Sequence, residues 1–136
     1  MEAVFTKEAA LMLEGLLAAG ANTNGFLIGR IQGNSCYITE LLPTGRVFTT
    51  RLERIVAVDD LYDGHLQGVF VFGDEQRNNK RFLAPWGFGK ILVTILQDAD
   101  GTASVKASLV DFDKDFFLKD IKIHTPFKEK QGEPAS

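Results

Sequence analysis

The chain has 136 residues, the size of one compact domain, and 45% of them are hydrophobic. Its formal net charge of −3 argues against a nucleic-acid-binding protein, because such proteins normally carry a clear excess of Lys and Arg. No run approaches the ~20 apolar residues needed to cross a bilayer, and the N-terminus lacks the pattern of a signal peptide. We therefore expect a cytoplasmic protein with one domain over residues 1–127 and a flexible tail at 128–136. Neither nucleic acid nor a membrane is expected among its partners.

The first predicted element is a helix over residues 7–19. Thr6 is a suitable N-cap, and Glu8 lies in the first turn, where a negative charge is favourable. Five apolar residues recur at helical spacing and form one stripe, namely Ala9, Ala10, Leu13, Leu16 and Leu17. Gly20 is a suitable stop for this helix.

Two β-rich runs follow, at residues 26–31 and 37–42. The connection between them, residues 32–35, reads Gln-Gly-Asn-Ser and has the chemistry of a hairpin turn, and Pro43 ends the second run. We predict that these two runs pair as adjacent antiparallel strands.

The second half of the chain reads as one ambiguous segment followed by strands. Residues 50–62 suit either a helix or an extended segment, and we favour a helix that ends before Gly64. Residues 67–72 are almost wholly apolar, as expected of a strand that is covered on both faces. Further strands are predicted at residues 90–97 and 102–112 around a turn at 98–101, with residues 116–123 as a last strand or edge segment. This order predicts an α+β domain in which helices flank a mixed sheet.

Glycines punctuate the first hairpin at Gly25 and Gly29, and a second apolar strand runs from Gly68 to Gly73. This order of elements resembles the JAB/MPN (JAMM) domain family, whose active members are zinc-dependent isopeptidases. The resemblance implies a three-layer α/β/α-like fold of the MPN and cytidine-deaminase type.

The resemblance also says where a zinc site would lie. In that family the strand that matches residues 68–73 runs into a His-x-His-Pro motif, and a hydrolytic zinc site needs about three ligands and a general base. The alignment places Asn22 at the glutamate base, Val71 and Gly73 at the two histidines, and Ala84 at the later Ser-x-x-Asp. None of these four residues performs the family's role. We therefore expect a degenerate, non-catalytic member that holds no metal and no cofactor.

Other reactive side chains have structural interpretations. His65 and His124 are not at paired-ligand spacing, and a solvent-facing or capping role is expected for His65. Cys36 is expected to be a reduced, buried core thiol, because no histidine lies near it in sequence to activate it. Asp74 and Glu75 fit a solvated turn, with a weak magnesium site completed by waters as the alternative.

Two segments are candidates for a binding surface. Arg77, Lys80 and Arg81 form a basic loop beside the vestigial site, which suits either the recognition of a phosphate or carboxylate or a purely solubilising role. Trp86 and Phe88 alternate with glycines, and such aromatics serve either as exposed interface anchors or as a cover for one end of the core.

Three hypotheses for the function follow. The resemblance implies a protein–protein interaction or scaffold module that binds a protein partner or forms a homo-oligomer. The alternative is a small-molecule or peptide-binding domain that uses the vestigial active-site cleft, lined by Trp86, Phe88 and the basic loop. The third is an enzyme of another class that uses Asp74, Glu75 or Cys36.

Overall fold

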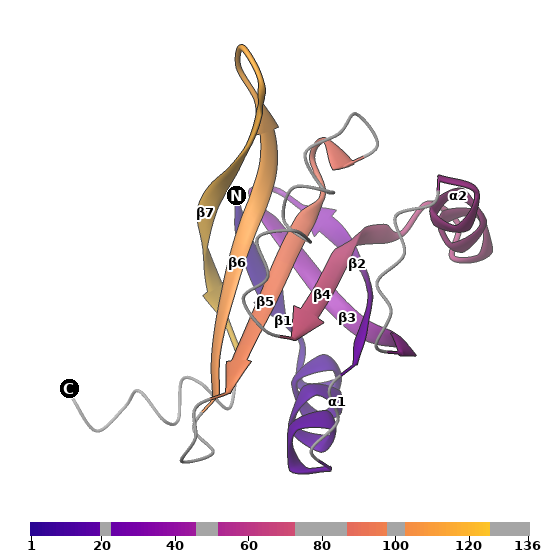
Figure 1. The fold of residues 1–136 in the computed structure, drawn as a ribbon, viewed down its shortest axis with the longest axis vertical. Coiled ribbons are helices and arrows are strands. Elements are labelled where there is room, and N and C mark those ends of the chain that lie inside the picture. Colours follow the sequence, from indigo (N-terminus) through magenta and orange to yellow (C-terminus); the bar gives the residue numbers. More distant parts are fainter. Residues whose placement is uncertain (20–22, 46–51, 73–86, 98–102, 126–136) are drawn as a thin grey trace, which may run out of the picture.

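The computed structural model describes residues 1–19, 23–45, 52–72, 87–97 and 103–125 of the chain (Figure 1). Within these ranges it contains seven strands and two helices. In chain order they are β1 (Glu2–Phe5), α1 (Lys7–Ala18), β2 (Asn24–Gln32), β3 (Ser35–Gly45), α2 (Leu52–Leu61), β4 (Leu66–Phe72), β5 (Ile91–Gln97), β6 (Ala103–Phe112) and β7 (Phe116–His124).

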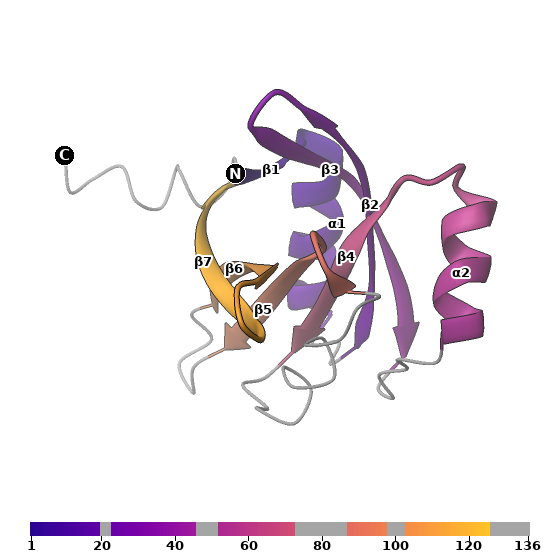
Figure 2. The same cartoon turned by 90° about the horizontal axis from the view of Figure 1, so that it is seen from above.

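The seven strands form a closed barrel in the order β1-β3-β2-β4-β5-β6-β7, with β7 returning to β1. The pairs β1–β3, β4–β5 and β1–β7 are parallel, and the other neighbours are antiparallel. Figure 2 shows the strands as a ring, with α1 within its outline, and Figure 1 places α1 at the lower end. In both views α2 lies to one side of the barrel.

The expected three-layer α/β/α fold is wrong, because the sheet closes on itself into a seven-stranded barrel, and the described residues form two helices beside it. This barrel also conflicts with the JAB and MPN domain assignment. The closure depends on β1, which pairs with both β3 and β7 and which the sequence analysis did not identify. A strand of four residues directly before a capped helix carries too little pattern to be recognised, and its pairings span most of the chain.

The local predictions for the first half of the chain are confirmed with one exception. Pro43 does not end the second strand, because β3 continues to Gly45 with Pro43 opposite Gly25. Helix α1 begins after Thr6, whose Oγ1 accepts a hydrogen bond from the Ala9 N–H at 3.3 Å. Strands β2 and β3 pair antiparallel, β4 is the other neighbour of β2, and residues 52–61 are helical. Gly20, the turn at 98–101 and the tail at 128–136 lie outside the described residues.

The hydrophobic core has two parts, one on each face of the sheet. Along β5, Ile91 and Val93 belong to one cluster, whereas Leu92 between them belongs to the other. Successive strand side chains point to opposite faces, so the clusters lie on opposite sides of the sheet. Leu13 of α1 packs into the first cluster and Ile55 of α2 into the second. Strand β4 is therefore covered on both faces, as its apolar sequence predicted.

Candidate functional site

Only one of the four vestigial metal positions is described by the structure. Val71 lies in β4 and is 1% exposed, so it is a core residue. Asn22, Gly73 and Ala84 lie outside the described residues. In the part of the chain that the structure describes, no three or more His, Cys, Asp or Glu side chains are grouped to hold a metal ion.

The predicted binding surface is described only at Phe88. Its side chain is 56% exposed, as an interface anchor requires, so at this position the alternative of core packing is wrong. Trp86, Arg77, Lys80 and Arg81 lie outside the described residues, and their roles stay predictions.

Cys36 is the buried thiol that the sequence predicted. It has no exposed surface and forms no disulfide. Burial raises its pKa to about 11, and the positive charge of Lys90 only partly opposes this shift. A thiol in this state is protonated near neutral pH and is a poor nucleophile. The other candidate groups for catalysis, Asp74 and Glu75, lie outside the described residues.

Among the described residues, neither histidine is grouped with other catalytic side chains. His65 is exposed, and its main chain accepts a hydrogen bond from the Gly29 N–H at 2.9 Å, which joins the start of β4 to β2. His124 lies at the end of β7, with its Nε2 2.8 Å from Oε1 of Glu2 on β1. Both residues therefore connect strands, His65 through its main-chain carbonyl and His124 through its side chain.

Strand β7 changes its neighbour along its length. Residues 116–121 pair with β6, whereas residues 122–124 pair with β1 and close the barrel. Two hollows flank the strand where it changes partner. The hollow on the β6 side has a volume of about 410 Å³, and the one on the β1 side about 250 Å³.

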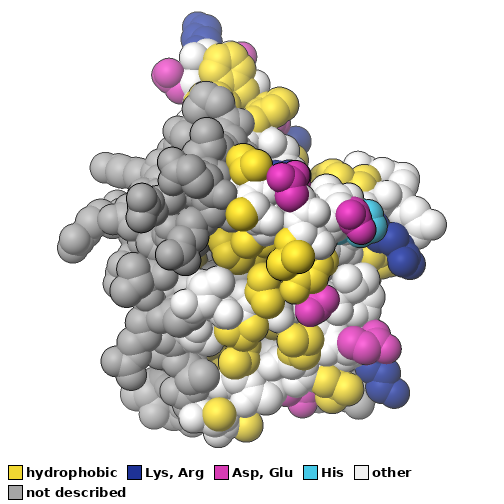
Figure 3. All heavy atoms as spheres, turned by 90° about the vertical axis from the view of Figure 1, so that its right-hand side faces the viewer, with side chains coloured by type: hydrophobic (Ala, Val, Ile, Leu, Met, Phe, Trp, Pro, Cys, Tyr) yellow, Lys and Arg dark blue, Asp and Glu magenta, His cyan; other side chains and the backbone are white. Residues whose placement is uncertain are grey.

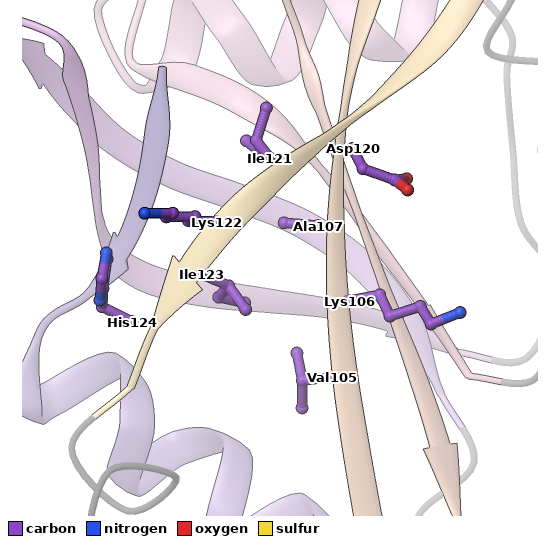
Figure 4. Close-up of a pocket in the computed structure, with 8 residues that line it drawn as sticks. All are labelled: Val105, Lys106, Ala107, Asp120, Ile121, Lys122, Ile123 and His124. Atoms are coloured by element: carbon purple, nitrogen blue, oxygen red, sulfur yellow. The ribbon is translucent and has the colours of Figure 1, made fainter.

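The hollow on the β6 side has an apolar floor and a polar rim (Figure 4). The floor consists of Val105, Ala107, Ile121 and Ile123, and the rim of Lys106, Asp120, Lys122 and His124. Figure 4 shows Asp120 and His124 at opposite ends of the hollow, so they do not form an acid–base pair. Such a lining suits the binding of an apolar group better than catalysis.

The hollow on the β1 side lies next to the first residues of the barrel. It is lined by Met1, Glu2, Asn34, Leu109, Lys119, Asp120, Ile121 and Lys122. Like the first hollow, it is lined by both apolar and charged residues, and no group of metal ligands is present among them.

A third feature is the hairpin of β6 and β7, which projects beyond the other strands in Figure 1. Phe112 lies directly opposite Phe116, and their rings form an edge-to-face pair with centroids 4.9 Å apart. Phe112 is 52% exposed, and Phe117 on the opposite side of β7 is 41% exposed. Figure 3 shows hydrophobic side chains gathered at this projecting end, beneath charged residues at its tip.

Phe88 lies near this hairpin. The turn that contains it is fixed to β6 by a hydrogen bond of 2.9 Å from the Gly89 N–H to the carbonyl oxygen of Val110. Val110 is two residues before Phe112 on the same strand. We call Phe88, Phe112 and Phe117 the aromatic end of the molecule. Single exposed apolar residues are common. These three half-exposed phenylalanines are grouped at one end of the molecule, with Phe117 on the opposite face of the hairpin from Phe112.

Of the three residues of the aromatic end, only Phe88 was predicted from the sequence as part of a binding surface. A signal for the other two was present, because residues 112–117 read Phe-Asp-Lys-Asp-Phe-Phe. Aromatic residues on both sides of a short polar segment are typical of a hairpin whose cross-strand pair is aromatic. Their exposure depends on how far the hairpin projects, and that length is set by the pairing of the other strands.

Within the described ranges, neither helix has the length and apolarity that a membrane span requires.

Comparisons with known proteins give a similarity of fold. No family model matches the sequence, and no curated protein matches it. A similar solved structure is the solution structure of protein DSY2949 from Desulfitobacterium hafniense, a structural genomics target. The TM-score is 0.61 and the identity is 18%, over 92% of each chain. The comparisons do not bear on the JAB/MPN resemblance. At this identity, the likeness to the Desulfitobacterium protein concerns the fold alone.

Proposed function

We propose that this chain is a non-catalytic protein-interaction module that associates with a second copy of itself through the aromatic end. The observation that carries the proposal is the presence of three phenylalanines, 56%, 52% and 41% exposed, on the projecting β6–β7 hairpin and on the turn that is hydrogen-bonded to it. Aromatic side chains are enriched in the central parts of protein interfaces, where they supply much of the binding energy.

The size of the aromatic end is consistent with an anchor within a larger interface. Each of the three rings has roughly 200 Å² of surface, of which about half is exposed. Together they expose about 300 Å² of aromatic surface. At about 25 cal/mol per Å², its full burial is worth on the order of 7 kcal/mol. Association itself costs about 4–15 kcal/mol, and stable interfaces bury about 800 Å² on each partner. Further contacts beside the phenylalanines are therefore required.

The chemistry of the described side chains supports a non-catalytic role. Cys36 is buried with a pKa of about 11, and Asp120 and His124 lie apart in the β6-side hollow. A general acid or base needs a partner or substrate within hydrogen-bonding reach. Among the described residues, the candidate groups do not meet in one cavity.

Cytoplasmic residence is part of the same proposal. The chain has a single cysteine, and that residue is buried as a free thiol. Small secreted domains instead commonly depend on disulfides for stability.

A second candidate function is the binding of a small apolar ligand in the β6-side hollow of about 410 Å³. The probe that tests it is 1-anilinonaphthalene-8-sulfonate, whose fluorescence rises in apolar surroundings. Ala107→Leu would fill the floor of the hollow, and we expect it to reduce the fluorescence, whereas Phe112→Ser should not. Equal fluorescence of wild type and Ala107→Leu would contradict ligand binding at this hollow.

Sedimentation velocity over a range of concentrations tests the proposed self-association. We expect Phe88→Ser and Phe112→Ser to raise the dimer Kd by about tenfold or more, the equivalent of ~1.4 kcal/mol. The matched control is Leu11→Ser on α1, because Leu11 is 57% exposed and lies outside the aromatic end. A wild-type protein that stays monomeric at high concentration would refute the proposal.

Trp86 remains a predicted second anchor of the same surface. If it is an anchor, Trp86→Ala should weaken association by more than about 1–2 kcal/mol and leave the fold intact. If Trp86 is instead a core residue, the same change should lower the free energy of unfolding by about 3–5 kcal/mol.

A further inference from the structure

Among the described residues, strand β7 has only one neighbouring strand along most of its length. Residues 116–121 pair with β6 on one side, whereas β1 on the other side begins at Glu2, opposite Lys122. In the part of the chain that the structure describes, no strand lies along this second side of residues 116–121. The β1-side hollow of about 250 Å³ lies next to this edge. An unpaired edge presents backbone donors and acceptors that bind another strand.

The register shows which peptide groups of β7 point to the open side. The Val110 N–H donates to the carbonyl of Lys90 at 3.0 Å, and the Val110 carbonyl accepts from the Gly89 N–H, so the peptide groups of Val110 point away from β7. Directly opposed residues of an antiparallel pair either exchange both hydrogen bonds or exchange none. Leu118, which lies opposite Val110, therefore points its own N–H and carbonyl away from β6. The N–H and carbonyl groups of Phe116 and Asp120, two positions before and after Leu118, point the same way.

The free part of this edge has a defined length. It is bounded by the bend at residues 113–115 and by the first residues of the barrel, since continuing the β1 register places Met1 opposite Ile121. Within the described ranges, residues 116–120 have no strand on this side, and Leu118 lies at their centre. If the β7 edges of two copies pair antiparallel with Leu118 opposite Leu118, residues 116–120 of each copy all take part. The pairing leaves β1 in place.

Neighbouring registers fit less well. The residues that exchange hydrogen bonds across the two copies must be ones whose N–H and carbonyl groups point to the open edge. The two-fold axis that relates the copies can therefore move along β7 only in steps of one residue. A step toward the C-terminus places Lys119 opposite Lys119 of the second copy, and like charges directly opposed are destabilising. It also requires Lys122, which is already paired with β1. A step toward the N-terminus leaves only residues 116–118 of each copy able to pair, because the chain bends at residues 113–115.

We infer that two copies of this chain dock by antiparallel pairing of their β7 strands about Leu118, which joins the two barrels by one continuous sheet. This inference rests on the proposed self-association and names the surface that carries it. In this register Phe117 of each copy lies opposite Lys119 of the other, where an ammonium group and its aliphatic stem cover a ring that is 41% exposed. The open edge adjoins the aromatic end, because Phe112 lies directly opposite Phe116.

Cysteine cross-linking tests the register. Phe117 and Lys119 of two copies would form a pair without mutual hydrogen bonds, with Cα atoms about 4.5 Å apart, within the range for a disulfide. We expect a mixture of Phe117→Cys and Lys119→Cys proteins to form a covalent heterodimer on mild oxidation. Neither variant alone should form a covalent dimer, whereas Leu118→Cys alone should. Wild type and Leu11→Cys are the controls, since Cys36 is buried.

Proline substitution tests the backbone hydrogen bonds. Asp120 is exposed, and its N–H points to the open edge. Proline lacks an N–H and is tolerated on edge strands where that group faces solvent. We expect Asp120→Pro to raise the dimer Kd by about tenfold or more and to leave the monomer folded. Asp120→Ala keeps the N–H and should associate like wild type. Lys119→Pro removes a donor to β6 and should unfold the hairpin.

The results separate the two proposals. A dimer that Phe88→Ser weakens, but that forms no Phe117–Lys119 cross-link, would overturn the β7 pairing and leave the aromatic end as the interface. A covalent dimer of Lys119→Cys alone would overturn the Leu118 register. A wild-type monomer at all concentrations would refute both proposals.

Discussion

Glu2 and His124 meet across the seam that closes the barrel, with Oε1 and Nε2 2.8 Å apart. The contact is diagonal, because Glu2 lies opposite Lys122 and His124 lies opposite Val4. The seam contains three residue pairs, whereas β7 pairs with β6 over six. In the part of the chain that the structure describes, no other strand pairs with the rest of this edge of β7.

The contact between Glu2 and His124 should contribute little to stability. Their side chains are 41% and 43% exposed, and exposed ion pairs contribute about 0–1 kcal/mol. In a double-mutant cycle of Glu2→Ala and His124→Ala, measured by urea unfolding, we expect a coupling energy below ~1 kcal/mol. Ile123→Ala, which removes a partly buried residue of the first core cluster, should cost more, about 2 kcal/mol. A coupling above the Ile123 effect would show that the polar contact holds the seam.

Gly68 and Gly15 form a matched pair of substitution sites. A Cβ at Gly68 would overlap the carbonyl oxygen of Ile91 on the neighbouring strand, whereas a Cβ at Gly15 in α1 would meet nothing within 4 Å. We expect Gly68→Ala to lower the free energy of unfolding by about 3 kcal/mol or more, because main-chain atoms would have to move. Gly15→Ala should raise it by about 0.5–1 kcal/mol, since alanine favours a helix. Circular-dichroism melts measure both. A harmless Gly68→Ala would show that β4 and β5 do not approach as closely as described.

The sequence predicted those elements whose signals are local. Thr6 and the apolar stripe behind it identified α1, and the Gly-Asn turn identified the β2–β3 hairpin. The continuous apolar run identified β4 as a strand covered on both faces. Each of these signals lies within about a dozen residues, where periodicity and turn chemistry are informative.

The closure of the barrel could not be predicted in the same way. It depends on the pairing of Glu2–Phe5 with residues 35–38 and 122–124, and four residues do not encode such distant partners. The candidate surface was missed for a related reason. Phe112 and Phe117 are apolar and fit a core pattern, and only the projection of the hairpin leaves them half exposed.

The purified protein should contain no stoichiometric zinc. The reason is chemical, because Asn22, Val71, Gly73 and Ala84 stand where the JAB/MPN resemblance implies a general base and metal ligands. Elemental analysis after dialysis checks this expectation. About one retained zinc per chain would overturn both the prediction and the alignment behind it.

Cys36 should make stability fall as the pH rises above 9. Its pKa is raised from 9.0 to about 11 by burial, so the folded protein keeps the proton that the unfolded chain releases first. The contribution of the neutral thiol is therefore complete below pH 9 and is lost between pH 9 and about 11. The loss should be on the order of 2–3 kcal/mol. Cys36→Ala lacks this titration but keeps those of the lysines and tyrosines, so subtracting its urea-unfolding curve from that of wild type isolates the thiol. Parallel pH dependences of the two proteins would mean that the thiol is not buried as described.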